Sequence, residues 1–461
     1  MPDTLALLAV LLFPQTESYP PPTTLGPVET YGARIQRTMS LLAESTPRRR
    51  STVRVLFYGQ SITEQAWWKE VAEDLRRRFP HANLVLENRA IGGFASQLLV
   101  KTAETDLYPF YPDLVIFHVY GSHLEYENII RRLRERTTAE ILLQTDHVTR
   151  DEDLTEETDP ARLTPANWSA WMNHVFLPSI ARKYGAELVD QRRLWKEYLR
   201  AHRLPAARLL RDAVHLNAHG CYLMAEIVKA HLRHDPRLSD GSWKEWVRTY
   251  EVGKDLFWKD GALALEFEGN RVDAIVAPGS AAPVAVRIDG RKPSEFPELY
   301  GRTRTTAYPG SIWPCLLRVT ADKPPVVEEW TLTLTEISED LQRFRFRVEG
   351  SRTGPDGEGN GSERFVSRSG RVVIDPADWN FAYALKVFGR KIDAGFRIRW
   401  KVVPFFVDEL VSSGGTDPAV ETVVTLAQGL PGGRHRLELL GGGPQAPVRA
   451  LRVYRPPLYS K

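Results

Sequence analysis

The feature that most constrains this chain is the regular alternation of short apolar runs and amphipathic stretches from Val53 to about His231. The first run, Val53–Tyr58, ends at a glycine, as is typical of a buried parallel strand. Repeated strand–helix units fold as a parallel sheet with helices on both faces, so we expect a three-layer α/β domain. The expected strands are 53–58, 84–86, 114–117, 141–143 and 187–189, and the expected helices are 67–75, 96–105, 124–136, 165–183 and 217–232.

The pattern changes after a polar linker near 234–242. From about 256 to 459 the residues alternate with the strand period, and Gly, Pro, Asp and Asn mark the turns. We therefore expect a β-sandwich in this half. At 461 residues the chain is too long for one core. The expected division is an N-terminal segment 1–50, an α/β domain 51–235 and a β-sandwich domain 250–461.

The amino-acid composition argues for a soluble globular protein and against a nucleic-acid binder. Hydrophobic residues make up 43% and charged residues 26%, as in ordinary soluble globular proteins. The 61 basic and 58 acidic residues leave a formal charge of only +3, which argues against a dedicated nucleic-acid binder. Cys221 and Cys315 are far apart and match neither a disulfide framework nor a metal-ligand spacing.

The N-terminal segment contains one apolar stretch, Leu5–Phe13, followed by a Pro-rich run. It is too short for a membrane-spanning helix, which needs about 20 residues. Its length suits the core of a signal peptide, but Asp3 stands where basic residues are usual. We favour export to a periplasmic or extracellular location, with no membrane insertion beyond a possible signal peptide.

Gly59-Gln60-Ser61 directly follows the first expected strand. A serine at such a strand-to-helix turn presents its hydroxyl at the end of the sheet, where helix N-terminal amides favour negative charge. The same stretch, Ser61-Ile62-Thr63-Glu64, also matches a helix capping box. Taken alone, the segment fits either a nucleophile or a cap.

Far downstream, Asp212-Ala213-Val214-His215 puts a carboxylate three residues before a histidine. Such a pair can serve as a catalytic base and its orienting group, although a loop ion pair is the alternative. A metal site at Asp212, His215 and His219 is a further alternative. The zinc-protease pattern His-Glu-x-x-His is absent, because Leu216 follows His215, so no metal site is expected.

The combination of Gly-x-Ser after the first strand and Asp-x-x-His before the last helix resembles the SGNH (GDSL-like) hydrolases over roughly residues 54–232. The resemblance implies Ser61 as nucleophile, His215 as base and Asp212 as its orienting group, with no metal or cofactor. The family's first block is Gly-Asp-Ser, and the variant with Gln60 occurs among members that act on carbohydrate esters. Gln60 is accordingly expected to contact the substrate.

The resemblance also implies an oxyanion hole. The family's second block is a glycine, matched here at Gly93, which would donate its N–H together with that of Ser61. The third block departs from the family, because Gly121-Ser122-His123-Leu124 stands in place of Gly-x-Asn-Asp. A ring N–H of His123 can replace the asparagine donor, and we favour that role. The alternative is that His123 is a surface loop residue and only two backbone donors exist.

Gln144-Thr145-Asp146-His147 follows the fourth expected strand, at the end of the sheet where substrate contacts belong. We expect Gln144 and Asp146 to contact the substrate, with a plain polar loop as the alternative.

The β-rich half resembles the jelly-roll modules that accompany sugar esterases. The similarity lies in Phe267–Arg271, Val286–Gly290 and Gly432–Glu438. Four tryptophans of this half either stack on sugar rings or pack in its core. They are Trp313, Trp330, Trp379 and Trp400.

The sequence thus predicts a serine esterase that removes a small acyl group, acetyl above all, from an oligo- or polysaccharide. An esterase for lipids or other small acyl esters is one alternative, and a non-catalytic glycan-binding protein is another. The oligomeric state is left open.

Overall fold

The computed structural model describes residues 19–23, 25–26, 28–277, 283–307, 313–381, 392–411, 417 and 419–459. The signal-like stretch Leu5–Phe13 lies outside these residues. Within the described ranges, no helix combines the length and the apolar character that crossing a membrane requires.

A five-stranded sheet forms the centre of the first domain, and all its neighbouring strands are parallel. The strand order is β2-β1-β3-β4-β5, so the expectation of a parallel sheet is confirmed. Gly59 at the end of β1 pairs with His118 at the end of β3, which brings the segments after both strands to the same edge. The strands are β1 Thr52–Gly59, β2 Asn83–Asn88, β3 Leu114–His118, β4 Glu140–Gln144 and β5 Glu187–Val189.

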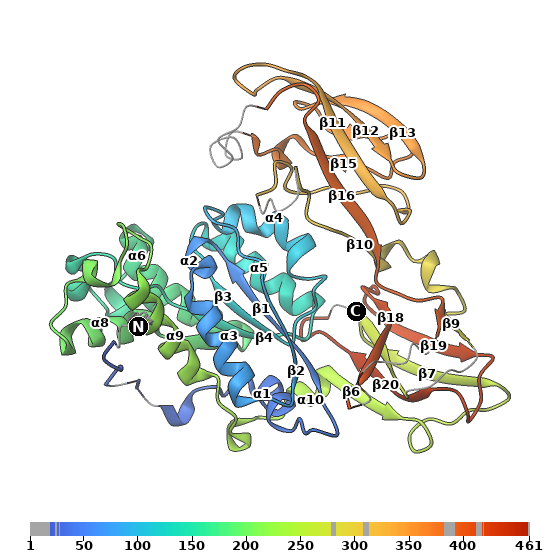
Figure 1. Ribbon diagram of the computed structural model, residues 1–461, viewed down its shortest axis with the longest axis horizontal. Helices are drawn as coiled ribbons and strands as arrows, with labels where there is room; N and C mark the ends of the chain where they lie inside the picture. The colour runs from blue at the N-terminus through green and yellow to red at the C-terminus, as the bar shows by residue number, and fades with distance from the viewer. Residues whose placement is uncertain are drawn as a thin grey trace, which may run out of the picture.

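Helices cover both faces of this sheet, which confirms the three-layer arrangement (Figure 1). Alternate residues of β1 point to opposite layers: Val55 and Phe57 pack with α1, α3, α8 and α9, whereas Leu56 and Tyr58 pack with α4, α5 and α7. The helices are α1 Gln36–Ala43, α2 Ser61–Glu64, α3 Trp67–Arg78, α4 Ser96–Asp106, α5 His123–Arg136, α6 Trp168–Trp171, α7 Leu177–Tyr184, α8 Gln191–Ala201, α9 Ala218–His231 and α10 Trp243–Trp246.

Two helices differ from the sequence-based expectation. The single helix expected over 165–183 is divided into α6 and α7 by a π-helical turn, Met172–Phe176. Pro178 lies just inside α7, and a proline has no N–H to donate to the carbonyl four residues earlier, which favours a break there. Helix α8 was not predicted, because its polar first turn hides the apolar face formed by Leu194, Trp195 and Tyr198.

The β-rich half contains a pair of four-stranded sheets that enclose one apolar core. Their orders are β17-β9-β19-β7 and β18-β8-β20-β6. The strands are β6 Val247–Glu251, β7 Ala262–Glu268, β8 Arg271–Val276, β9 Val284–Ile288, β17 Glu409–Leu410, β18 Thr422–Gln428, β19 Arg434–Leu440 and β20 Val448–Tyr454. This arrangement accounts for the sandwich expected from the sequence.

Between β9 and β17 the chain leaves the sandwich and builds a second β-module with its own core, at the top of Figure 1. The sequence pattern suggested one sandwich over 250–461, because strand alternation looks the same in either core. Trp330 and Trp400 are buried in this second core, which supports their packing role. The strands are β10 Tyr300–Arg302, β11 Glu329–Ile337, β12 Phe344–Gly350, β13 Gly354–Asn360, β14 Phe365–Val366, β15 Val373–Ile374 and β16 Arg397–Pro404.

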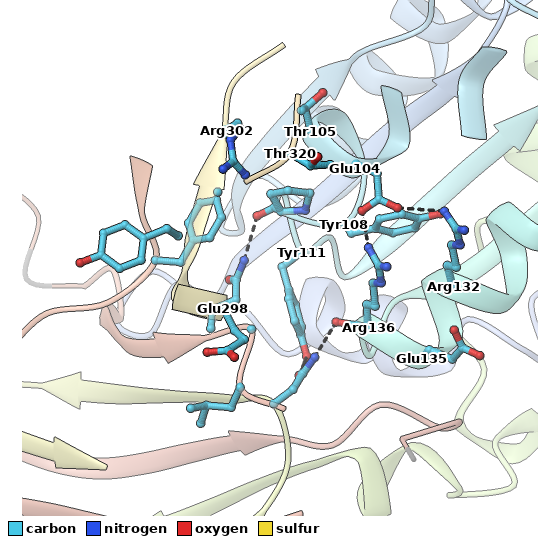
Figure 2. A pocket seen from close by; sticks show the side chains of 18 of the residues that line it. Glu104, Thr105, Tyr108, Tyr111, Arg132, Glu135, Arg136, Glu298, Arg302 and Thr320 are labelled. Atoms are coloured by element: carbon cyan, nitrogen blue, oxygen red, sulfur yellow. Dashed lines mark hydrogen bonds and ion pairs between the residues drawn. The ribbon is translucent and has the colours of Figure 1, made fainter. Parts of the chain in front are cut away.

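Polar contacts join the α/β domain to the β-rich half. Tyr111 Oη donates to Asn270 Oδ1 over 2.9 Å, and Asn270 Nδ2 donates to the carbonyl of Arg136 over 2.8 Å. Arg304 forms an ion pair with Asp106 at 2.9 Å. A cavity of about 830 Å³ lies at this junction, and Figure 2 shows Tyr108 and other residues that line it. Its lining includes neither Ser61 nor His215.

Candidate active site

The turn that carries Ser61 is dictated by the end of β1. Gly59 lies against β3, and a Cβ atom added to it would be 2.0 Å from the carbonyl oxygen of His118, so only glycine fits. Gln60 is extended, with φ −112° and ψ −157°, and serves as the N-cap residue of α2. Ser61 is therefore the first residue of that helix, at the carboxyl edge of the parallel sheet.

The capping-box interpretation of Ser61-Ile62-Thr63-Glu64 does not hold in the structure. Helix α2 has no side-chain capping hydrogen bond. A carboxylate oxygen of Glu64 instead accepts the amide N–H of Gly92 at 2.6 Å. Burial raises the pKa of Glu64, although the Gly92 amide opposes this shift. The Ser61 hydroxyl is thus not used to cap its helix.

The loop from Leu210 to Leu216 carries the second motif and closes on itself. A β-bridge joins Leu210 to Leu216, and the amide of Arg211 donates to the carbonyl of His215 at 2.7 Å. Asp212 Oδ1 accepts the amide of His215 at 2.8 Å, and a second amide, that of Val214, at 2.9 Å. These two bonds, with that from His215 first, hold the pKa of Asp212 well below its usual range. The carboxylate is thereby kept ionised and fixed beside its histidine.

The side chains of Ser61, His215 and Asp212 form a continuous line of hydrogen bonds. His215 Nε2 is 3.0 Å from Ser61 Oγ, and His215 Nδ1 is 2.9 Å from Asp212 Oδ2. Because an ionised carboxylate only accepts, Nδ1 carries the ring proton and Nε2 presents its lone pair to the serine hydroxyl. The His215 side chain is 32% exposed and that of Asp212 is 47% exposed, so the line of groups is open to solvent. This arrangement can transfer a proton from Ser61 to His215.

Two backbone N–H groups are suited to an oxyanion. Those of Ser61 and Gly93 have no hydrogen-bond partner within the described part of the chain. The amide of Ile91 donates to the carbonyl of Gly59 at 3.0 Å, which holds the loop after β2 beside the nucleophile turn. Gly93 is exposed and has φ +76°, a conformation that favours glycine.

His123 is the first residue of α5, directly after the N-cap residue Ser122. Its ring makes edge-on contacts with Trp171 and Phe176, at centroid distances of 5.4 and 5.7 Å. No hydrogen bond to the ring occurs among the described residues. These aromatic neighbours fix the ring at the carboxyl edge of the sheet, and the donor role stays a prediction.

The three expected substrate contacts differ in accessibility. Gln60 is half-buried beside the nucleophile. Gln144 and Asp146 are only 2% and 8% exposed, so they lie beneath the surface on which a substrate would rest. Gln144 ends β4 and Asp146 comes just after it, as the sequence predicts, and their role as substrate contacts stays a prediction. A short polar run does not encode their burial.

The sequence did not predict the side chain that joins the segments carrying Ser61 and His215. Gln65 Nε2 donates to the carbonyl of Leu216 at 2.8 Å, and Gln65 Oε1 accepts the amide of the same residue at 3.0 Å. This pair of bonds connects the end of α2 to the residue that follows His215. A glutamine four residues after the serine carries no signal of such a contact.

Of the four tryptophans named from the sequence, the remaining two, Trp313 and Trp379, are half-buried and have defined partners. Trp313 Nε1 donates to the carbonyl of Gly92 at 2.9 Å, so the second β-module contacts the loop that carries Gly93. Trp379 packs on Phe381 and Phe344.

His219, the third residue of the metal alternative with Asp212 and His215, has aromatic partners. His219, in the first turn of α9, has its Nε2 2.7 Å from Tyr198 Oη. Its ring stacks on that of Tyr19. Ser61 and His215 instead line a depression of about 660 Å³ together with Glu64, Gln65, Arg211 and Leu216.

Comparisons with known proteins give matches only among solved structures. No family model matches the chain, and no curated protein matches it. A two-domain esterase active on acetylated mannans matches 93% of this chain and 98% of its own length, at 13% identity and a TM-score of 0.36.

Two further matches cover 41% of this chain. The acetylxylan esterase of Geobacillus stearothermophilus matches over 97% of its own length, at 20% identity and a TM-score of 0.34. A GDSL-like lipase of Parabacteroides merdae matches over 100% of its length, at 18% identity and a TM-score of 0.33. Because these TM-scores are below 0.5, the function proposed next depends on the geometry of the site itself.

Proposed function

We propose that this protein is a serine esterase that releases acetyl groups from an acetylated oligo- or polysaccharide. The observation that carries the proposal is the line from Ser61 Oγ through His215 to Asp212, with spacings of 3.0 and 2.9 Å. Such a line suits acyl transfer, in which a neutral histidine accepts the serine proton as the ester carbonyl is attacked.

In the proposed reaction His215 Nε2 removes the Ser61 proton, and Asp212 stabilises the resulting imidazolium. The N–H groups of Ser61 and Gly93, with a ring N–H of His123 as a third donor, hold the oxyanion. Each such donor contributes about 3 kcal/mol. His215 then returns the proton to the leaving sugar oxygen, and a water molecule, activated in the same way, releases acetate.

Two observations support a small acyl group on a carbohydrate. The lining of the depression around Ser61 includes the polar and charged side chains of Glu64, Gln65 and Arg211, which suit contacts with the hydroxyl groups of a sugar. Gln60 lies next to the nucleophile, as in the carbohydrate-active members of the family that this sequence resembles.

The test is a panel of esters. Turnover of p-nitrophenyl esters should fall steeply from acetyl to butyryl and be negligible at octanoyl, because extra methylenes must displace packed atoms. Acetylated xylan or mannan oligosaccharides should give a higher kcat/KM than p-nitrophenyl acetate, because sugar contacts orient the ester. A preference for octanoyl esters, or no acetate release from any acetylated glycan, would replace this proposal with a general esterase. Absence of hydrolysis of every ester would favour a glycan-binding protein.

A further inference from the structure

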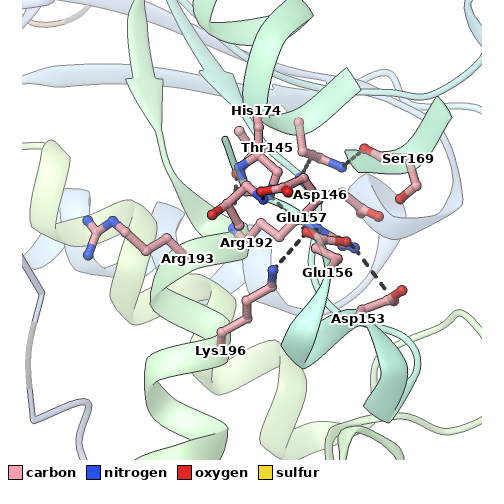
Figure 3. Close-up of polar contacts among 12 residues, drawn as sticks. Thr145, Asp146, Asp153, Glu156, Glu157, Ser169, His174, Arg192, Arg193 and Lys196 are labelled. Carbon is pink, nitrogen blue, oxygen red and sulfur yellow. Dashed lines mark hydrogen bonds and ion pairs between the residues drawn. The ribbon is translucent and has the colours of Figure 1, made fainter. Parts of the chain in front are cut away.

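A second group of titratable side chains lies directly beneath the catalytic loop. His118 is the last residue of β3, and Asp146 and His147 come just after β4. Their side chains are 2%, 8% and 0% exposed, and one ligand atom of each lies within 4.8 Å of the other two. Figure 3 shows Asp146 beside Thr145 and Arg192. The proposed ester hydrolysis uses none of these three groups.

The proton on His147 can be placed from its surroundings. His147 Nε2 is 2.8 Å from the carbonyl oxygen of Val214, which only accepts, so Nε2 carries the proton. The other nitrogen of the neutral ring, Nδ1, therefore presents a lone pair. It lies 3.0 Å from Asp146 Oδ1, and His118 Nε2 lies 3.4 Å from the same oxygen.

These short distances are not hydrogen bonds. Although they are buried, Asp146 Oδ1 and His147 Nδ1 have no hydrogen-bond partner among the described residues. With a neutral His147 ring, the lone pair of Nδ1 and the carboxylate oxygen of Asp146 are 3.0 Å apart. In a medium of low dielectric constant these two groups repel each other. A cation between them removes the repulsion and satisfies both atoms.

We propose that His118, Asp146 and His147 bind a zinc ion, with a water molecule as fourth ligand. Zinc takes imidazole and carboxylate ligands at about 2.0–2.2 Å, so neighbouring ligand atoms of a tetrahedral site are about 3.3 Å apart. The observed separations of 3.0 and 3.4 Å agree with that edge length. The bond from His147 Nε2 to a backbone carbonyl is the usual outer contact that orients a zinc-bound histidine.

The surrounding charges tolerate a divalent ion. The guanidinium of Arg192 is a neighbour of the cluster and donates to the carbonyl of His147 at 2.9 Å. The carboxylate oxygens of Glu156 lie 2.5 and 2.6 Å from two nitrogens of Arg192, and the same group pairs with Lys196 at 2.8 Å (Figure 3). A second carboxylate, that of Asp153, lies 3.6 Å from Arg192, so two carboxylates face these two cations. The carboxylate of Asp146 is thus left to balance the ion.

The zinc ion would brace the catalytic loop without taking part in ester cleavage. His147 holds the carbonyl of Val214, and the amide of Val214 donates to Asp212 at 2.9 Å. An ion that fixes His147 therefore fixes the loop that presents His215. The inference concerns a binding site and stands whether or not the substrate is an acetylated sugar.

The test measures bound metal on the full chain. Protein is prepared metal-free and mixed with zinc or cobalt(II) chloride, and bound metal is counted after gel filtration. We expect one equivalent of zinc per chain, a visible absorption band of four-coordinate cobalt, and a higher melting temperature in the presence of zinc.

Asp146→Asn and His147→Ala should lose at least nine-tenths of the bound metal, whereas His219→Gln, at a buried histidine outside the cluster, should keep it. If a variant does not fold, the cobalt spectrum of the parent alone decides whether the chain holds a four-coordinate metal site. If the parent takes up no stoichiometric zinc or cobalt, or if folded His147→Ala keeps its metal, the proposal is overturned.

Discussion

The turn that carries Ser61, the proposed nucleophile, and the loop that carries His215, the proposed base (the base loop), are held in place in different ways. Ser61 follows a strand whose last residues, Val55–Gly59, are all buried, and the fit of Gly59 against β3 sets its position locally. Asp212 and His215 lie on an exposed loop with little regular structure of its own. Contacts from Gln65 and His147, distant in sequence, hold that loop. Packing thus positions the nucleophile, whereas a few polar bonds position the base.

We therefore expect the loss of a single polar contact to displace His215. A single polar substitution near β1 should leave Ser61 in place, because packing holds it.

Asp212→Asn should lower kcat by roughly 10⁴-fold, because an amide does not hold His215 in the tautomer that accepts the serine proton. The fold should survive, since Asp212 is exposed and an amide oxygen can still accept the two loop N–H groups. Steady-state hydrolysis of p-nitrophenyl acetate measures the effect, and circular dichroism checks the fold. A fall of less than tenfold would mean that Asp212 does not orient the base.

His123→Ala should lower kcat by roughly 10²-fold with little change in KM, because an oxyanion donor acts mainly in the transition state. The ring also packs against Trp171 and Phe176, so thermal unfolding must be followed alongside. His123→Phe is the matched control, since it keeps the aromatic contacts and removes the donor. If His123→Phe retained the parental kcat, the oxyanion site would consist of backbone donors alone.

Gln65→Ala should lower kcat by roughly tenfold or more, because loss of both bonds to Leu216 lets the base loop shift relative to Ser61. Gln65→Glu keeps the oxygen that accepts the Leu216 amide and should recover part of the activity. The decisive readout is the split between kcat and KM, since Gln65 acts through His215. Equal kcat in both variants and the parent would show that the loop holds its position without this contact.

The smallest expected effect on activity comes from Glu156→Gln, beneath the base loop. Burial alone would raise the pKa of Glu156, but hydrogen bonds, foremost that from Arg192, hold the pKa well below its usual range. Its ionised form therefore adds stability above the ordinary glutamate pKa of about 4.3, and this stability is lost as the pH falls through the lower folded value.

The melting temperature of the Gln variant should lie below that of the parent at pH 7, and the difference should shrink as the pH falls below about 4. Thermal scans of both proteins from pH 7 to pH 3 test this. A difference that stays constant across the range would show that the charge of Glu156 is not involved.

The sequence predicts much of the first domain, because strand and helix periods are local. Each expected strand of the parallel sheet is present, and Ser61, Asp212 and His215 meet where strand ends and the last helix place them. The second β-module was not anticipated, since alternation does not tell which strands share a core. The roles of Gln65 and His147 depend on contacts 151 and 67 residues away along the chain, which no local pattern encodes.

Covalent labelling of Ser61 tests the central claim most directly. A fluorophosphonate reacts with a serine hydroxyl that a neighbouring base activates, and intact mass with peptide mapping locates the product. We predict one phosphonyl group per chain, on Ser61, with labelling at least 10²-fold slower in His215→Ala and absent in Ser61→Ala. Labelling of another residue, or equal labelling of parent and His215→Ala, would contradict the assignment of Ser61 as a nucleophile activated by His215.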